Sequence, residues 1–510
     1  MRVSVFPSTC SGALALGPQV SSPRTSSDHP CVGRYASLMA ARTPRTLAAV
    51  ILAAGKGKRL RSRTPKVLHP VAGRPALWHV LQLVLEAKPT KIVVVIGHGA
   101  GDVKAAVRSW GVTPAPVFVT QTEQLGTGHA VLASRRAVGT TDDVLIANGD
   151  LDPVGPGDIG ALLRKHRRTG AVATIASSHL GEPGGYGRVV RDTRGRVTDV
   201  IEGSDAPPEI LAIDEVATNW MAFRRADLFR ALPLIDRTNR QREYYLNRVV
   251  PILLEKGDRI EAVICDTGGV MGLNSREGLA GVERLFRSRI NQRHMANGVT
   301  LLDPGATYID VGVSIGRDTV IYPNSYLQGS SVIGKGCTIG PSTVIQDSSV
   351  GDRSEVWFSV VLGSTIGRDV QVGPFARLRP GVAMADRSRA GAFVDMKQVH
   401  LGRGSKVPHL SYVGDAVIGE DVNVGAGAIT VNFDGYDKHG TVIEDGARIG
   451  SDTMLVAPVR VGRDANTGAG SVITHDVPAG ALAVERSDQR TVPGYRKRKD
   501  AQRDGKVKGT

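Results

Sequence analysis

A glycine-rich basic loop follows the first apolar stretch of the chain and has the composition of a phosphate-binding loop. Residues 46–54 are apolar enough for a buried strand, and they lead into the sequence Gly-Lys-Gly-Lys-Arg-Leu at 55–60. A parallel strand ending in such a loop directs backbone N–H groups towards an anion, while basic side chains neutralise its charge. The loop matches neither the dinucleotide-binding glycine pattern nor the P-loop pattern. On its own it could equally be a turn.

Asp150 occupies a position from which it could bind a metal ion. Strands and helices alternate from residue 46 to residue 150, which predicts a parallel α/β sheet with ligands at the carboxyl ends of its strands. One expected strand, 144–147, ends in Asn148-Gly149-Asp150. Mg²⁺ prefers one or two protein oxygens together with phosphate oxygens and water. A single aspartate after a strand is just as often a turn former, so its neighbours must decide.

The second half of the chain carries a six-residue repeat. Six is neither the helical period nor the two-residue alternation of a strand, and it is typical of a β-helix built from hexapeptides. A β-sandwich would not hold such a frame for so long. The frame recurs through residue 473 after slips. Its first aliphatic positions are Ile315, Ile321, Leu327, Ile333, Ile339 and Ile345.

Polar and basic segments interrupt this frame. Breaks in a repeat are where loops and sites lie. One of them contains His409, whose imidazole could accept a proton near neutral pH. A lone histidine is more often structural, so its role depends on what surrounds it. The interrupting segments are 375–381, 394–397, 406–415, 423–427 and 432–438.

Composition excludes several classes of protein. The chain has 510 residues, a length typical of several domains, and its 41% hydrophobic content suffices for packed cores. No apolar run is long enough to span a membrane. The net charge of +15 suits anionic small molecules, and no nucleic-acid-binding motif accompanies it. Cys10, Cys31, Cys265 and Cys337 lie far apart without metal-ligand spacing, so we expect a reducing cytoplasm.

Three further segments complete the predicted organisation. Residues 1–45 have the composition of a disordered extension: either a transit peptide or, as we favour, an over-long gene start before Met39. Apolar residues on one face predict a linker helix over 276–297. The basic tail could cover a ligand or be solvated and disordered. The predicted boundaries are 46–275 for the α/β domain, 276–300 for the linker, 301–484 for the β-helix and 485–510 for the tail.

Several motifs together resemble those of sugar-phosphate nucleotidyltransferases. They are Leu-Ala-Ala-Gly-Lys-Gly-Lys-Arg at 52–59, Pro-Lys-Val-Leu at 65–68, Glu-Gln-Leu-Gly-Thr-Gly-His at 123–129 and Gly149-Asp150. With the hexapeptide column behind them, residues 46–490 resemble the bacterial bifunctional N-acetylglucosamine-1-phosphate uridyltransferase/glucosamine-1-phosphate acetyltransferase family. The implied fold is a Rossmann-like, parallel-rich α/β domain followed by an all-β left-handed parallel β-helix.

The resemblance implies a UTP site with Mg²⁺ in the α/β domain. Arg59 and Lys66 would act on the UTP phosphates, and Asp150 with Asn274 would bind Mg²⁺. Gln121, Gly126 and Thr127 would bind uracil, and Gly187 and Glu202 the sugar. The same motifs imply further nucleotide contacts at Leu52, Ala53, Ala54, Gly55, Asn148 and Gly149.

The resemblance also implies an acetyl-transfer site on the column, with His409 as the base. Acetyl transfer to an amine needs a base, cations for the sugar phosphate and donors for the thioester oxyanion. Arg379 and Lys397 resemble a phosphate-binding pair, and Tyr412, Asn423 and Lys438 resemble sugar contacts. Asp395 stands beside the base where the family usually has glutamate. The implied acetyl-CoA positions are Ala426, Asn432, Phe433, Ser451, Ala469 and Arg486.

The sugar pocket departs from the family pattern. Ala217, in the sequence Glu-Val-Ala-Thr-Asn at 215–219, replaces an amide, and Asn219 replaces the usual glycine. Losing a polar partner costs about 1–3 kcal/mol when its mate stays buried and unpaired. Either the sugar preference is altered, or these substitutions are neutral because other residues bind the sugar instead. Other departures are Ser204 in the loop after Glu202, Asp152 after Asp150, and Asn247-Arg248 in place of Thr-Asp.

The resemblance implies a homotrimeric cytoplasmic enzyme with two transferase activities. It would acetylate glucosamine 1-phosphate from acetyl-CoA and then transfer UMP from UTP, giving UDP-N-acetylglucosamine for cell-wall polysaccharide. One alternative is a sugar-1-phosphate nucleotidyltransferase, such as an adenylyl- or thymidylyltransferase, with altered preference and a structural β-helix. Another is a scaffold protein with a decayed sugar pocket.

Overall fold

The computed structural model describes residues 45–151, 154–155, 157–268 and 272–507. The fold described here is that of the unit Thr46–Thr510. Of the extension predicted over 1–45, residues 1–44 lie outside the described residues. Asp152 also lies outside them.

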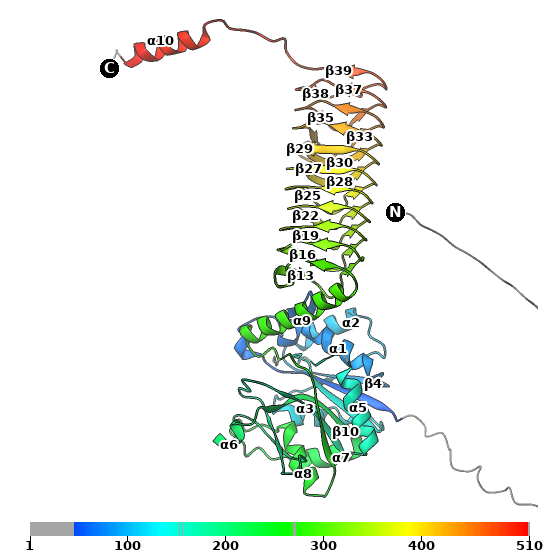
Figure 1. Cartoon of the computed structure of the whole chain (residues 1–510), viewed down its shortest axis with the longest axis vertical. Coiled ribbons are helices and arrows are strands. Elements are labelled where there is room, and N and C mark those ends of the chain that lie inside the picture. The colour runs from blue at the N-terminus through cyan, green and yellow to red at the C-terminus, as the bar shows by residue number, and fades with distance from the viewer. Residues whose placement is uncertain (1–44, 152–153, 156, 269–271, 508–510) are drawn as a thin grey trace, which may run out of the picture. The chain divides into compact units, whose positions relative to one another are not determined.

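A nine-stranded mixed sheet forms the first part of this unit (Figure 1). Its main path is β11-β7-β10-β6-β1-β4-β5, and the hairpin β8–β9 pairs onto β10. All pairs along the main path are parallel except those of β10, which runs antiparallel to β6 and β7. The strands are β1 (Leu47–Ala53), β4 (Lys91–Ile96), β5 (Val117–Thr120), β6 (Asp143–Asn148), β7 (Ala173–His179), β8 (Arg188–Arg191), β9 (Val197–Ile201), β10 (Glu215–Arg224) and β11 (Ile260–Ile264).

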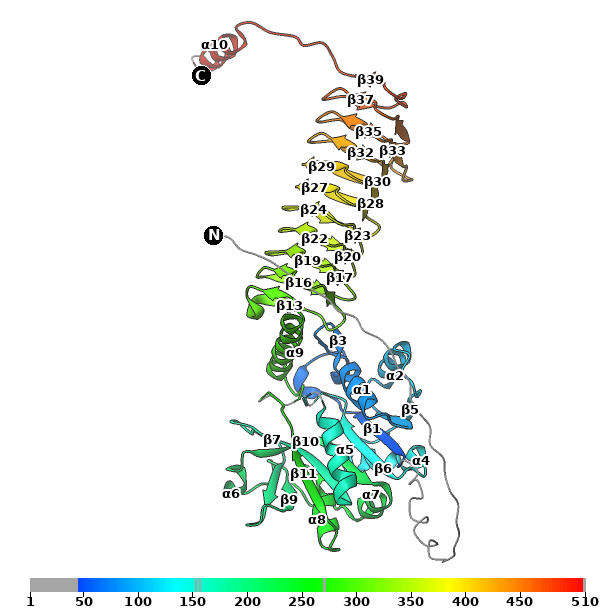
Figure 2. The ribbon, with the colours of Figure 1, turned by 45° about the vertical axis from the view of Figure 1, so that its right-hand side comes forward.

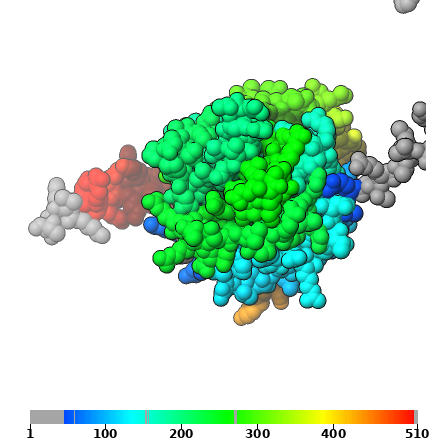
Figure 3. All heavy atoms as spheres, turned by 90° about the horizontal axis from the view of Figure 1, so that it is seen from below, coloured from blue at the N-terminus to red at the C-terminus, as the bar shows by residue number. Residues whose placement is uncertain are grey.

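The strand β1 shows why the sheet is buried on both faces. Ala49 and Ile51 pack into one apolar cluster, and Ala48 and Val50 pack into another, because successive side chains of a strand point to opposite faces. Helices supply the remaining apolar side chains, and Figure 3 shows the surface of this domain from below. The helices are α1 (Ala76–Glu86), α2 (Ala100–Ser109), α3 (Thr127–Ala133), α4 (Arg135–Val138), α5 (Asp158–Thr169), α6 (Pro208–Leu211), α7 (Arg225–Ala231) and α8 (Val249–Leu254).

The helix α9 (Arg276–Ala296) spans the segment expected to form a linker. Ser275 caps its first turn by accepting a hydrogen bond from the Gly278 N–H at 3.1 Å. Glu283 accepts from the backbone of Ala72, in the turn between β2 (Pro70–Val71) and β3 (Arg74–Pro75), at 2.7 Å. Asn291 donates to the carbonyl of Pro304 at 2.8 Å. The helix is therefore hydrogen-bonded both to the α/β domain and to the start of the column.

The column runs from β12 (Thr300–Leu301) to β39 (Leu482–Ala483), and its short strands stack rung upon rung (Figure 2). Every third strand pairs in parallel, as β15 (Val320–Ile321) does with β18 (Thr338–Ile339), so three strands make one coil. Of the six frame residues predicted to point inwards, Ile315 is partly buried and the other five are at most 2% exposed. The predicted fold class, an α/β nucleotidyltransferase domain followed by a left-handed parallel β-helix, is confirmed.

The end of the chain differs from the solvated, disordered tail that charge alone predicts. Residues Tyr495–Val507 form a helix, α10. Lysine, arginine, glutamine and alanine are good helix formers, and Arg496 pairs with Asp500 one turn on at 3.2 Å. Among the described residues, no helix has the length and apolarity needed to cross a bilayer.

Candidate functional site

The glycine-rich loop and the loop after β6 meet at one edge of the sheet. The strands β1 and β6 are neighbours with Leu52 opposite Asn148, and the Gly149 N–H donates to the Leu52 carbonyl at 2.8 Å. A cavity of about 470 Å³ opens there. Its lining includes nine of the residues implied for UTP: Leu52, Ala54, Gly55, Lys66, Gln121, Gly126, Thr127, Asn148 and Asp150.

Two cationic side chains, Lys66 and Arg59, cluster beside this cavity with two oxygen-bearing side chains, Asp150 and Asn274. Lys66 Nζ donates to Asp150 Oδ2 and, at 2.6 Å, to Asn274 Oδ1. Arg59 Nη2 donates to the same Asn274 oxygen at 3.1 Å. The side chains of Lys66 and Asp150 are only 13% and 15% exposed, so water screens this pair weakly. Four predicted residues from three distant segments therefore form one cluster.

The oxygen donors of this cluster fit Mg²⁺. Asp150 and Asn274 direct oxygens at a single cationic nitrogen, so both already face positive charge. One carboxylate and one amide oxygen leave coordination positions for phosphate and water, the arrangement that Mg²⁺ favours. No group of three or more histidine, cysteine or acidic side chains suited to a metal occurs in the part of the chain that the structure describes.

The loop expected to bind uracil is held by hydrogen bonds from two directions. Gln121 is 4% exposed, and its amide donates to the Gly126 carbonyl at 3.1 Å. Gly126 has φ 112°, and a side chain there would meet the Tyr244 carbonyl at 2.6 Å, so glycine is required. Thr127 Oγ1 accepts from the Leu246 N–H at 2.9 Å.

Five residues of the cavity lining were absent from the sequence prediction: Lys56, Val67, Gln124, Ala130 and Glu243. Gln124 lies within the motif at 123–129 and could have been included on that ground. Glu243 could not, because only the fold brings its segment against the loop, where the Tyr244 N–H donates to the Leu125 carbonyl at 2.8 Å.

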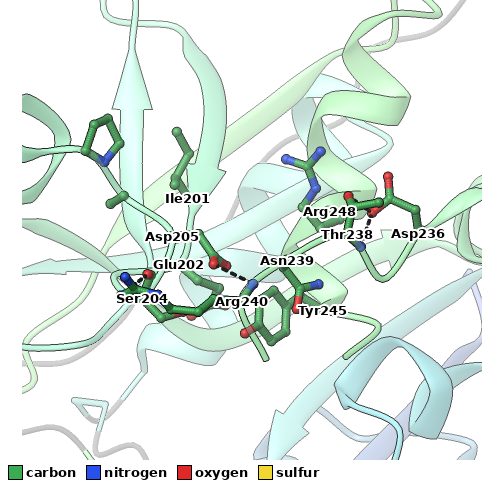
Figure 4. Close-up of a pocket in the computed structure, with 12 residues that line it drawn as sticks. Ile201, Glu202, Ser204, Asp205, Asp236, Thr238, Asn239, Arg240, Tyr245 and Arg248 are labelled. Atoms are coloured by element: carbon green, nitrogen blue, oxygen red, sulfur yellow. Dashed lines mark hydrogen bonds between the residues drawn. The ribbon is translucent and has the colours of Figure 1, made fainter. Parts of the chain in front are cut away.

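The residues implied for the sugar form a separate group near this cavity. Glu202 Oε1 accepts from Asn247 Nδ2 at 2.6 Å, and burial raises the pKa of Glu202. A side chain added at Gly187 would lie 3.7 Å from Glu202 Oε1. A pocket of about 490 Å³ opens beside Glu202, with Ser204, Arg240, Tyr245 and Arg248 in its lining (Figure 4).

The other residues implied for the first site take structural places around it. Ala53 is the buried last residue of β1. Asn219 has φ 60°, a left-handed conformation that asparagine tolerates better than most residues. Ala217 is 2% exposed and has no polar side-chain atom to offer a sugar.

On the column, Arg379 and Asp395 form a bidentate ion pair. Arg379 Nε and Nη2 donate to the two oxygens of Asp395 at 2.8 and 2.6 Å. The guanidinium also lies over the Tyr412 ring, 5.8 Å from its centroid. This pairing raises the pKa of Arg379, chiefly through the hydrogen bonds to Asp395. Asp395, expected to stand beside the base, thus accepts hydrogen bonds from Arg379 on both of its oxygens.

Two lysines lie close together near this pair. Lys397 is on β28 (Asp395–Leu401). Lys438 closes a short loop by forming an antiparallel bridge with Phe433. The nearby Lys438 ammonium lowers the pKa of Lys397. Like charges held together repel unless an anion joins them, so the two lysines favour a bound anion. Asn432 donates to Asp415 next to the same loop.

His409 lies at the end of β29 (Lys406–His409), one corner before β30 (Tyr412–Ile418). It pairs with Ala392 on the preceding coil. The two coils can lie this close together because residue 391 is glycine. A side chain there would lie 2.0 Å from the Pro408 carbonyl oxygen. Within the described residues, the His409 imidazole is exposed and makes no hydrogen bond or ion pair. The structure therefore does not join His409 to Arg379, Lys397 or Tyr412 inside one chain.

The positions implied for acetyl-CoA fall on successive coils of one edge. The Asp452 N–H donates to the Ala426 carbonyl at 2.7 Å, and the Gly470 N–H donates to the Ser451 carbonyl at 2.8 Å. Arg486 Nη1 donates to the Ala469 carbonyl at 2.9 Å. Phe433 is 56% exposed. Asn423, on β31 (Asn423–Val424), lies on the sheet that carries His409, opposite Lys406 and Arg448.

Replacing Asp395 by alanine is expected to weaken binding of glucosamine 1-phosphate. Arg379 would lose its orienting carboxylate, and the KM for the sugar phosphate should rise by about two- to tenfold. Both side chains are about a third exposed, at 31% and 32%, so stability should change little. Steady-state acetyl transfer measures the effect. Asp369→Ala, which breaks the similar pair with Arg353, is the matched control, and equal KM changes in both variants would contradict the prediction.

The fold and the two sites define a class: a nucleotidyltransferase domain joined to a hexapeptide transferase. Residues 49–241 match the family model of the MobA-like NTP transferase domain. Residues 312–347 and 440–475 match the model of the bacterial transferase hexapeptide (six repeats). The predictions of an enzyme and of two transferase activities, nucleotidyl transfer and acyl transfer, are confirmed.

Curated relatives narrow this class to one family. The bifunctional protein GlmU of Heliobacterium modesticaldum is 46% identical over 453 residues, covering 88% of this chain and 98% of the relative. The bifunctional protein GlmU of Carboxydothermus hydrogenoformans is 45% identical over 447 residues, covering 88% and 99%. The chain belongs to the family of bifunctional GlmU proteins.

Proposed function

We propose that the two sites catalyse consecutive steps that end in UDP-N-acetylglucosamine. The column acetylates glucosamine 1-phosphate from acetyl-CoA, and the α/β domain joins the product to UMP from UTP. The observation that carries this proposal is that one chain holds two separate cationic sites. One is the cluster of Lys66, Arg59, Asp150 and Asn274, and the other is the group around Arg379 and Lys397.

In the acetyl-transfer step, the amine of the sugar attacks the thioester carbonyl and the CoA thiolate leaves. His409 takes the proton that the amine loses, which its exposure at the column surface permits. Arg379, Lys397 and Lys438 hold the sugar phosphate, and Tyr412 and Asn423 contact the sugar. Ala426, Asn432, Phe433, Ser451, Ala469 and Arg486 are the proposed acetyl-CoA contacts.

In the second step, a phosphate oxygen of the sugar attacks the α-phosphorus of UTP and the bond to pyrophosphate breaks. Lys66 and Arg59 neutralise the phosphates, while Gln121, Gly126 and Thr127 hold the uracil. Asp150 and Asn274 would hold Mg²⁺, which when bound stabilises negative charge on the phosphates. Glu202 accepts a hydrogen bond from the sugar.

The assembly and location also belong to this proposal. We propose domains at 46–275, 276–300 and 301–484, a basic tail at 485–510, and a cytoplasmic homotrimer formed through the column. A shared site is consistent with the His409 imidazole making no hydrogen bond or ion pair among the described residues of the single chain. Neighbouring subunits could then complete each acetyl-transfer site.

Ala217 favours a second candidate, a uridyltransferase with altered sugar preference. Separate assays distinguish the two: pyrophosphate release from UTP with a panel of sugar 1-phosphates, and acetyl-CoA consumption with glucosamine 1-phosphate. We expect N-acetylglucosamine 1-phosphate to be the best substrate of the first assay. Faster turnover of another sugar phosphate would favour the second candidate, and no acetyl-CoA consumption would refute the acetyl-transfer step.

A further inference from the structure

The sugar-facing end of the α/β domain contains an amide contributed by a different segment from Ala217. We propose that Asn247 is a positioning and specificity residue of the sugar subsite. In this role it orients Glu202 to accept a hydrogen bond from a hydroxyl of the hexosamine ring, and it supplies the amide that Ala217 lacks. The inference rests on the proposed uridylyl transfer, and it identifies how this chain redistributes its sugar contacts.

The contact between Asn247 and Glu202 is short and shielded. Asn247 Nδ2 donates to Glu202 Oε1 at 2.6 Å, and Asn247 is only 4% exposed. One carboxylate oxygen is thereby fixed, and the other stays available for a donor. A hydrogen bond to a charged group is stronger than one between neutral groups, particularly where water is excluded. Asn247 therefore determines where the free oxygen of Glu202 points.

Gly187 lies against the Asn247 amide, and Ala217 lies next to Gly187. The Ala217 N–H donates to the Gly187 carbonyl at 2.9 Å, so the two backbones are adjacent. A side chain added at Gly187 would lie 3.0 Å from Asn247 Nδ2, closer than nearly all real contacts. Glycine at this position therefore leaves room for the Asn247 amide. Gly187 thus adjoins Asn247 and Ala217 adjoins Gly187, and neither of these two positions brings a polar side chain of its own.

The segment that carries Asn247 is also tied to the loop proposed to bind uracil. Asn247 lies in the short 3-10 helix η4 (Leu246–Arg248). The Leu246 N–H donates to Thr127 Oγ1 at 2.9 Å, and the Gly128 N–H donates to the Tyr244 carbonyl at 2.7 Å. Asn247 is therefore fixed relative to the uracil loop. This connection places the sugar acceptor at a set distance from the nucleotide.

The pKa of Glu202 offers a second way to measure the role of Asn247. Burial raises the pKa of Glu202, the hydrogen bond from Asn247 opposes that rise, and Asp205 and Glu243 add to it. Tyr245, Arg240 and Arg248 line the adjoining pocket. Only the ionised carboxylate accepts with both oxygens. Removing the donor at Asn247 should therefore raise this pKa further and move the acid limb of activity to higher pH.

The test compares Asn247→Leu, which removes the donor at similar volume, and Asn247→Asp with the parent in pyrophosphate release from UTP and N-acetylglucosamine 1-phosphate. The KM for the sugar phosphate should rise on the order of tenfold in Asn247→Leu, and more in Asn247→Asp, which adds a second carboxylate. The KM for UTP should stay within about twofold, because Asn247 lies on the sugar side. The acid limb of kcat/KM for the sugar phosphate should move to higher pH in both variants.

Controls separate this role from a structural one. Thr198→Ala, an exposed residue of β9, should behave as the parent, and acetyl transfer by the column reports whether each variant is folded. An unchanged KM for the sugar phosphate, or equal increases in both KM values, would overturn the inference alone. No turnover by the parent with this substrate would overturn the proposed function, and the inference with it.

Discussion

Replacing His409 by alanine is expected to reduce acetyl transfer by about 10²- to 10⁴-fold, the usual contribution of a general base. Release of pyrophosphate from UTP should be unchanged, because His409 lies on the column and the cavity proposed for UTP lies at the edge of the α/β sheet. Stability should also be unchanged. The imidazole is exposed and makes no hydrogen bond within the described residues, so its loss leaves no buried group unpaired.

The matched control for this variant is His400→Ala. His400 is an exposed histidine of β28 on the same column, so its replacement removes an imidazole without touching the proposed site. Both activities of each variant are measured on the same preparation. Acetyl transfer at the parental rate in His409→Ala would exclude this residue as the base.

Replacing Asp150 by asparagine is expected to impair nucleotidyl transfer and spare acetyl transfer, the reverse of the effect expected for His409→Ala. Pyrophosphate release should fall by at least about 10²-fold, because the change removes the carboxylate that faces Lys66 beside Asn274. Acetyl transfer should be unaffected. Chelation of Mg²⁺ by EDTA should mimic the variant, stopping pyrophosphate release and sparing acetyl transfer.

Asp102→Asn provides the control for Asp150. Asp102 is an exposed acid in the first turn of α2, away from the UTP cavity lining. Pyrophosphate release that survives in Asp150→Asn, or that persists in EDTA, would contradict the proposed metal-assisted step. Loss of both activities in Asp150→Asn would indicate a folding defect, and the melting temperature would then fall as well.

The repeat made the column predictable from local sequence. One aliphatic residue per short strand faces inwards, so positions such as Ile321 and Ile339 report both the strand and its orientation. The glycine-rich loop and Asp150 were expected at the ends of strands of a parallel sheet, whereas the residues implied for UTP came from the family resemblance. The meeting of Lys66 with Asn274, 208 residues apart in sequence, required the fold.

The contacts of single side chains were less predictable. Asp395 was expected near His409, yet it pairs with Arg379 because successive coils align the two residues. From the sequence, Asn247 could be noted only as a departure from the family pattern. Its partner Glu202 comes from a strand end far away in sequence, so their contact depends on tertiary packing.

The central claim is that one chain performs both transfers in sequence. The most direct test incubates the full chain with glucosamine 1-phosphate, acetyl-CoA, UTP and Mg²⁺ and follows every product by mass spectrometry. The account predicts CoA, pyrophosphate and UDP-N-acetylglucosamine in equal amounts. A nucleotide sugar that lacks the acetyl group, or acetyl-CoA consumption without any nucleotide sugar, would contradict it.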